Sequence, residues 1–63
     1  MLKTFHVTGY AVNRRGHNQG IHYTLTMLAT TSADTAQTEA LRWSAADDHR
    51  HTRITSVRVV SHA

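Results

Sequence analysis

Residues 21–43, IHYTLTMLATTSADTAQTEALRW, contain the two patterns that decide the fold. In the first ten residues of this stretch, apolar side chains alternate with a histidine, three threonines and Leu28. Period-two alternation predicts a β-strand over residues 21–30 that is buried on one side. The side chains on its apolar face are Ile21, Tyr23, Leu25, Met27 and Ala29.

A helix is predicted directly after this strand. Thr31 or Ser32 can cap the free amides of the first turn, and Asp34 and Glu39 lie toward the positive end of the helix dipole. A stripe of apolar residues follows at spacings of three and four, and it continues to Asp47. We therefore expect the helix to end near Ala46 or Asp47, with Leu41 off the stripe as a flank contact or an exposed apolar residue. The stripe, in which Trp43 is the expected large anchor, consists of Ala33, Ala36, Ala40 and Trp43.

A second strand is predicted upstream, over residues 3–12, where Phe5, Val7 and Ala11 alternate with polar side chains. Gly9 falls on the apolar side, which indicates a bulge or a close packing contact with another element. Residues 13–20, NRRGHNQG, contain two glycines, two asparagines and no apolar residue. This composition predicts a long hairpin loop between the two strands.

A third strand is predicted over residues 53–61, after a polar connection at 48–52. Its phase is ambiguous, because Val57 and Val59 mark one face while Ile54 and Val60 mark the other. A bulge near Thr55 and Ser56 would reconcile the two faces. Burial of the strand on both faces would also do so.

These elements predict an α+β fold with the order β-β-α-β in a single domain, residues 1–63. A right-handed crossover that jumps one strand gives a three-stranded antiparallel sheet in the order 2-1-3. One helix then packs on one face and leaves the other open. Because this core is small, dimerisation through an edge strand or the open face would add buried surface, although it is not required. The expected core residues are Phe5, Val7, Ile21, Tyr23, Leu25, Met27, Trp43, Val57 and Val59.

Length and composition limit the possible functions. A chain of 63 residues is too short for a deep catalytic cleft, and its lack of cysteine excludes disulfides and thiolate metal sites. Neither a G-x-S-x-G elbow nor a phosphate-binding glycine loop occurs, so we expect no enzyme and no cofactor. No apolar run approaches the roughly 18 residues of a membrane span, and the residues after Met1 lack the apolar core of a signal peptide. A cytoplasmic protein without membrane contact is therefore expected.

Histidines form two candidate metal sites. His49 and His51 follow Asp47 and Asp48, but their spacing matches no strong metal-binding motif. His6 and His22 are expected to be cross-strand neighbours on the face away from the core. Solvated side chains explain both groups, so no metal site is predicted.

Charge is distributed unevenly around a net value of +3. All four acidic residues lie within residues 34–48, and the charged residues of both flanking segments are all basic. Exposed edges, an open sheet face and separate acidic and basic surfaces favour protein binding. A nucleic-acid partner is also consistent with Arg14 and Arg15 at the hairpin tip, beside Asn18 and Gln19, and with a stacking surface of Tyr10, His6 and His22. The predicted partner-binding residues are Tyr10, Arg14, Arg15, His17, Asn18, Arg53 and Arg58.

The layout resembles that of small proteins of bacteriophages and mobile elements. The resemblance lies in the hairpin over residues 3–30 and in the Ala-rich helix opening TSADTAQTEA, residues 31–40, followed by one last strand. Anti-CRISPR inhibitors are a group of this size. The resemblance implies a non-enzymatic inhibitor that docks on a host protein complex, such as a CRISPR effector, and blocks DNA entry or nuclease recruitment in the host cytoplasm.

Many anti-CRISPR proteins are acidic mimics of DNA, whereas this chain is basic. The resemblance therefore implies direct docking on an acidic or mixed surface. The leading hypothesis is a phage-type inhibitor. The alternative is a small basic DNA- or RNA-binding regulator that uses the Arg14-Arg15 loop, and a third possibility is a structural subunit that assembles with the products of neighbouring genes.

Overall fold

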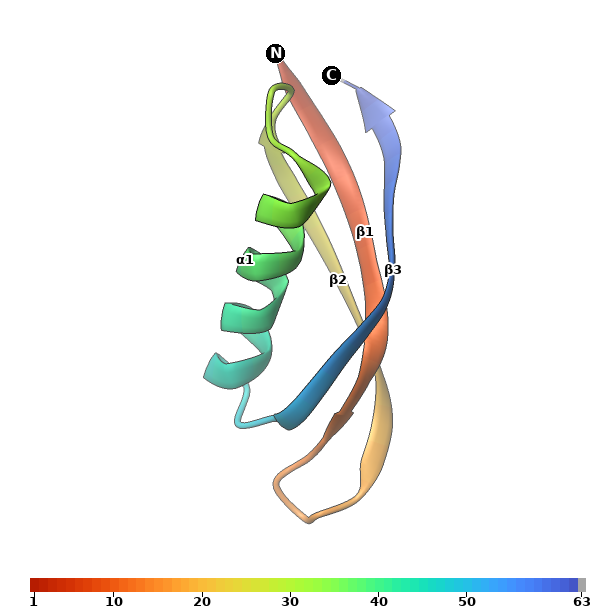
Figure 1. Ribbon diagram of the computed structural model, residues 1–63, viewed down its shortest axis with the longest axis vertical. Helices are drawn as coiled ribbons and strands as arrows, with labels where there is room; N and C mark the ends of the chain where they lie inside the picture. The colour runs from red at the N-terminus through yellow and green to blue at the C-terminus, as the bar shows by residue number, and fades with distance from the viewer. Residues whose placement is uncertain (63) are drawn as a thin grey trace.

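The computed structural model describes the backbone of residues 1–62 and the side chains of residues 1–60. Its elements are β1 (Leu2–Val12), β2 (Asn18–Leu28), α1 (Ala33–Ala46) and β3 (Arg50–His62). Both neighbours of β1 run antiparallel to it, in the order β2-β1-β3, and α1 covers one face of the sheet (Figure 1). The predicted α+β fold and its strand order are confirmed.

The β1–β2 hairpin is longer and its loop shorter than predicted. The two strands pair without a register shift from Leu2 opposite Leu28 to Val12 opposite Asn18. The loop is short because Asn13 Oδ1 accepts hydrogen bonds from the backbone amides of Arg15 (2.9 Å) and His17 (3.0 Å). The predicted loop over 13–20 is therefore wrong at its end, since residues 18–20 belong to β2. At the far end β2 stops at Leu28, and residues 29–30 form a turn.

The core lies between β1, β2 and α1. Phe5, Val7 and Leu25 are buried beneath two alanines of the helix, Ala36 and Ala40. Tyr23, Met27, Ile54 and Val57 are partly buried around this cluster. Two residues predicted for the core are instead exposed, Trp43 by 42% and Val59 by 44%.

The buried stripe of α1 differs from the predicted one. Ala36, Ala40 and Ser44 are buried at a spacing of four, so the stripe ends on a small polar residue instead of Trp43. Ser44 is accommodated because its hydroxyl hydrogen-bonds to that of Thr52 at 2.5 Å. Trp43, one residue away, packs edge-to-face on Tyr23 with the ring centroids 5.9 Å apart. Leu41 is 38% exposed, which agrees with the second of its two expected alternatives, an exposed apolar residue.

The helix boundaries agree with the sequence. Ser32 is the N-cap, and its hydroxyl accepts a hydrogen bond from the Thr35 amide at 3.2 Å. The last helical residue is Ala46, and Asp47 is the C-cap. Asp48 then adopts a positive φ of 62°, which turns the chain into β3.

Strand β3 begins at Arg50, three residues earlier than predicted, and its pairing with β1 shifts register three times. One shift leaves Thr55 as an extra residue between the pairs Gly9–Ile54 and Thr8–Ser56, so of the two alternatives for this strand the bulge near Thr55 is the one found. Because of this bulge, Ile54 and Val57 both reach the core. The close contact predicted for Gly9 is confirmed, since a Cβ there would lie 2.1 Å from the backbone oxygen of Arg53.

Candidate binding face

The sheet has one face away from α1, which we call the open face. Phe5 and Val7 of β1 point toward the helix. Since successive side chains of a strand point to opposite faces, His6, Thr8 and Tyr10 of β1 lie on the open face. Tyr10 is 54% exposed, so it presents a large aromatic surface to solvent.

The register places all three arginines of β3 opposite open-face residues of β1, and Arg50, at the start of the strand, also lines a hollow with Ala45 and Asp48 at the end of α1. Arg50 is opposite Val12, Arg53 is opposite Tyr10, and Arg58 is opposite His6. Residues that are directly opposite in an antiparallel pair share a face of the sheet. The arginines therefore form one row beside the open-face residues of β1.

This row exists because β3 is bulged. Arg53 is three positions after Arg50 and five positions before Arg58. Because both separations are odd, a regular strand would place Arg53 on the opposite face from the other two arginines. One register shift falls in each interval, between Tyr10 and Val12 and between Thr8 and Gly9 of β1. Each bulge restores the phase, so the arginines face the same way.

Two histidines add to the open face. The imidazole rings of His6 and His22 are 4.8 Å apart between centroids and nearly perpendicular, which confirms that they are cross-strand neighbours. Arg58 is the β3 partner of His6. Among the described side chains, no carboxylate belongs to this face, because the described part of each strand contains neither Asp nor Glu.

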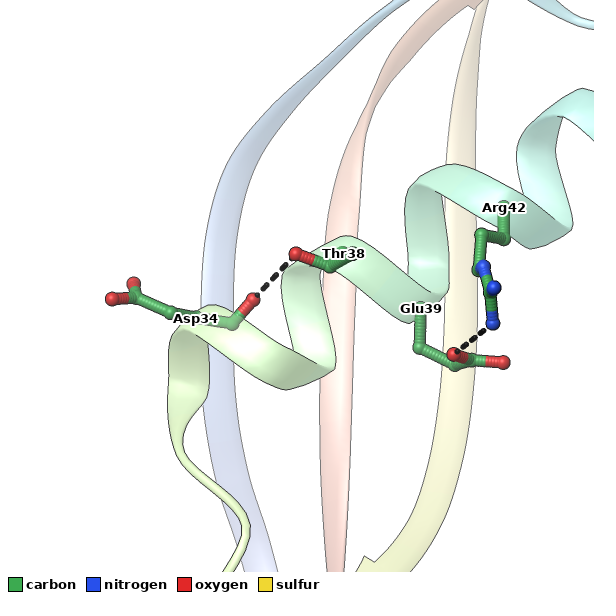
Figure 2. Close-up of polar contacts among 4 residues, drawn as sticks. All are labelled: Asp34, Thr38, Glu39 and Arg42. Atoms are coloured by element: carbon green, nitrogen blue, oxygen red, sulfur yellow. Dashed lines mark hydrogen bonds and ion pairs between the residues drawn. The ribbon is translucent and has the colours of Figure 1, made fainter.

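The acidic residues lie on the helical side of the molecule. Figure 2 shows Asp34 and Glu39 on α1, with the sheet behind the helix. Glu39 Oε2 is paired with Arg42 Nη1 at 3.4 Å, and the Thr38 hydroxyl donates to the backbone oxygen of Asp34 at 3.0 Å. The sheet thus separates an acidic helix from a basic open face.

A hollow of about 500 Å³ lies at the hairpin end of the open face. It brings together three predicted binding residues, Tyr10, Asn18 and Arg53, and adds His51 and Val12 to its lining. Another predicted binding residue, Arg58, lies further along the same face. Its β1 partner is four residues from Tyr10, which corresponds to about 13 Å along a strand.

The hairpin-loop residues divide into two groups. Arg15 and His17 are exposed at the tip of the hairpin. Arg14 instead forms an ion pair with Asp48, and both side chains line a separate hollow with Ala45, His49 and Arg50. The structure therefore does not bring Arg14 together with Tyr10 and Arg53. The partner of Arg14 is distant in sequence, and no local pattern indicates it.

The histidines after α1 have separate surroundings. His49 Nε2 lies 2.9 Å from Gln19 Nε2, within hydrogen-bonding distance, whereas His51 lines the hollow beside Tyr10. Within the part of the chain that the structure describes, no group of three or more His, Asp or Glu side chains could hold a metal ion.

Sequence reasoning missed a polar contact between the helix end and β2. The hydroxyl of Tyr23 donates to Asp47 Oδ2 at 2.9 Å. Burial, this hydrogen bond and the charge of Asp47 together raise the pKa of the Tyr23 phenol above its ordinary value of 10. The contact fixes the end of α1 on the sheet, away from the open face.

The chain matches no known protein family, and neither a curated protein nor a solved structure is significantly similar to it. The helix of the described residues is not long and apolar enough to cross a membrane.

Proposed function

We propose that this protein is a non-enzymatic module that binds single-stranded nucleic acid on its open face. The observation that supports the proposal is the row of Arg50, Arg53 and Arg58, which two bulges bring onto a face that also carries Tyr10, His6 and His22.

The spacing of the row suits a polyanion. The β1 partners of Arg50 and Arg53 are two residues apart, and those of Arg53 and Arg58 are four apart. Along a strand these separations correspond to about 7 and 13 Å. Positive charges repeated along one line can each pair with a phosphate of an extended strand, and arginine is well suited to phosphate because its guanidinium can donate two hydrogen bonds.

A single strand fits this face better than a duplex does. Bases of a single strand can stack on aromatic side chains, and Tyr10 and the two histidines provide such rings on a sheet surface. Reading a duplex groove requires an inserted helix or β-ribbon, and at the tip of the β1–β2 hairpin Arg14 is already paired with Asp48. The exposed side of α1 carries Asp34 and Glu39, whose charges repel phosphates, so the helix is a poor groove reader.

Docking on a host protein, as an anti-CRISPR-type inhibitor would do, is the competing proposal. Protein interfaces are centred on buried aromatic or aliphatic anchors surrounded by a polar rim. The middle of the open face consists of small polar residues and two histidines, with Tyr10 toward one end: His6, Thr8, His22, Thr24 and Ser56. This composition favours the nucleic acid.

The test measures fluorescence anisotropy of a labelled single-stranded oligonucleotide of mixed sequence, titrated with protein over a series of salt concentrations. Three phosphate contacts predict a slope of about −2 for log K against log salt, a loss of about 20-fold between roughly 50 and 200 mM salt. Arg53→Gln and Arg58→Gln should each weaken binding and reduce the magnitude of the slope by about 0.7.

Arg42→Gln is the matched control, because it removes the same charge from the helical side. An equal effect of Arg42→Gln on binding, or a binding constant that does not depend on salt concentration, would overturn the proposal. A pull-down from bacterial lysate, with and without nuclease, distinguishes nucleic-acid binding from docking on a host protein. Recovery of a discrete protein partner that survives nuclease and is lost with Arg53→Gln would overturn the proposal in favour of docking on a protein.

A further inference from the structure

The outer edge of β2 is unusual for an exposed strand. The strand is 11 residues long, pairs with β1 without a register shift, and carries no Asp, Glu, Lys, Arg or Pro. Because β2 is the last strand of the order β2-β1-β3, its second edge has no strand partner among residues 1–62. Unpaired edges of this kind are templates for pairing with another chain.

Two hydrogen bonds identify the residues that face outward. The amide of Ala29 donates to the oxygen of Met1 at 3.1 Å, and that of Asn13 donates to the oxygen of His17 at 2.8 Å. These bonds extend the β1–β2 ladder at both ends. Since hydrogen-bonded and non-hydrogen-bonded pairs alternate in an antiparallel ladder, odd-numbered residues of β2 bond to β1. The even-numbered ones direct their backbone groups outward.

The outward-facing residues share two further properties. All are exposed, and their backbone groups make no hydrogen bond to a described side chain or loop, except that the oxygen of Leu28 accepts one from the Thr31 amide at 2.9 Å. They are Asn18, Gly20, His22, Thr24, Thr26 and Leu28.

The opposite edge of the sheet is protected. Strand β3 shifts register three times and carries Arg50, Arg53 and Arg58. Bulges and charged side chains are the features by which natural sheets block edge-to-edge pairing. The two edges of this sheet therefore differ, and β2 is the edge whose outward backbone groups, apart from the Leu28 oxygen, are open to another strand.

We propose that the β2 edge binds the β2 edge of a second copy of this chain, in antiparallel pairing about a two-fold axis. Full overlap centres the axis at Tyr23 and pairs Asn18 with Leu28 of the second copy, His22 with its Thr24, and Tyr23 with its Tyr23. Every outward amide and carbonyl of β2 then has a partner. No formally charged residue lies opposite a like one, so the edge is complementary to itself.

Aromatic packing and the small core favour the same partner. The two Tyr23 residues form a non-hydrogen-bonded pair, the closer of the two pair types, on the face that α1 covers. Trp43 packs on Tyr23 and is 42% exposed in the isolated chain, so dimer formation covers it. A chain of this size buries a small share of its surface, and a continuous six-stranded sheet adds to that share.

A two-fold axis perpendicular to the sheet places both helices on one side and both open faces on the other. Dimerisation therefore doubles the row of arginines on one surface. This inference does not depend on the proposed function, because it rests on the edge and not on the open face.

The test is sedimentation equilibrium over a wide range of protein concentration, together with the fluorescence of Trp43, the only tryptophan. We expect a mass of twice 7.1 kDa, with the Trp43 emission shifting to shorter wavelength as dimer forms. Thr24→Pro removes an outward amide near the axis without removing a bond to β1, and it should raise the dimer dissociation constant at least tenfold. Val59→Pro is the matched control, because by the same alternation its amide faces outward on the β3 edge.

Far-UV circular dichroism establishes whether each proline variant is folded. If Thr24→Pro does not fold, Thr24→Lys replaces it, since a charge on an edge strand opposes pairing. Its control is Thr8→Lys, which adds the same charge to the same face on the central strand. A wild-type monomer at all concentrations, or a dimer that persists in the folded Thr24 variant, overturns the inference. A monomer that still binds the oligonucleotide overturns it and leaves the proposed function intact.

Discussion

Gly9 lies where the backbone of β3 passes close to β1. A Cβ at this position would meet three backbone atoms of Arg53 and Ile54 between 2.1 and 3.0 Å away. Backbone atoms cannot move aside as the end of a side chain can. Gly9→Ala should therefore lower the free energy of unfolding by about 3 kcal/mol, measured by urea denaturation.

Gly20, on the neighbouring strand, provides the control for Gly9. A Cβ there has its nearest neighbours at 4.0 Å, and its backbone is not in the left-handed region. Gly20→Ala should raise the free energy of unfolding by about 0.5 kcal/mol, because alanine loses less conformational freedom in a strand. Equal destabilisation by both substitutions would contradict the close approach at Gly9.

Tyr23 makes stability depend on pH in the alkaline range. Its pKa is raised in the folded protein, first by burial and then by the hydrogen bond and charge of Asp47. The stabilisation is fully present below the unfolded pKa of about 10 and is lost as the pH rises through the higher folded pKa.

We expect Asp47→Asn to lower the pKa of Tyr23 toward 10. Ultraviolet absorbance of the tyrosinate measures this in a Tyr10→Phe background, in which Tyr23 is the only tyrosine. An unchanged titration after Asp47→Asn would mean that burial alone causes the shift.

At the scale of elements, α1 depends on its N-cap. The hydroxyl of Ser32 satisfies the Thr35 amide, and the buried side of the helix consists of small residues, which contribute little burial. Ser32→Ala should lower the free energy of unfolding by about 1 kcal/mol and the Tm by about 4–8 °C. Thr30→Ala, at an exposed turn position, is the control for thermal denaturation and should change the free energy of unfolding by no more than about 0.5 kcal/mol.

Strand β3 shows where sequence patterns stop being informative. The conflict between Ile54 and Val57 indicated one bulge, because two apolar residues fell on opposite faces. The bulge beside Arg53 left no such conflict, since it shifts polar residues that are acceptable on either face. The bulge near the end of the strand leaves Val60 as the extra residue, and the sequence pattern did not separate it from the bulge at Thr55. The common direction of the three arginines therefore could not be predicted, although Arg53 and Arg58 were.

At the scale of the whole molecule, local patterns were sufficient for the strand order and the helix boundaries. Alternation in β2, the Ser32 cap and the turn residues each depend on neighbours in sequence. The side-chain contacts that α1 and the residues after it make with distant segments were not predictable. Arg14 pairs with Asp48 across the molecule, and Trp43 is exposed because Ala36, Ala40 and Ser44 set how the helix is rotated on the sheet. Of the predicted site, Tyr10, Asn18 and Arg53 are brought together and Arg14 is not.

The central position of β1 has a consequence for how fast the chain folds. Its pairing with β2 is local, and hairpins of this kind form in about 1–10 μs. Its pairing with β3 joins residues near the two ends of the chain, so Lys3 meets His62 only after the loop between them has closed. We expect this closure to limit the folding rate, because non-local contacts slow folding and the small face of α1 gains little until the sheet beneath it is complete.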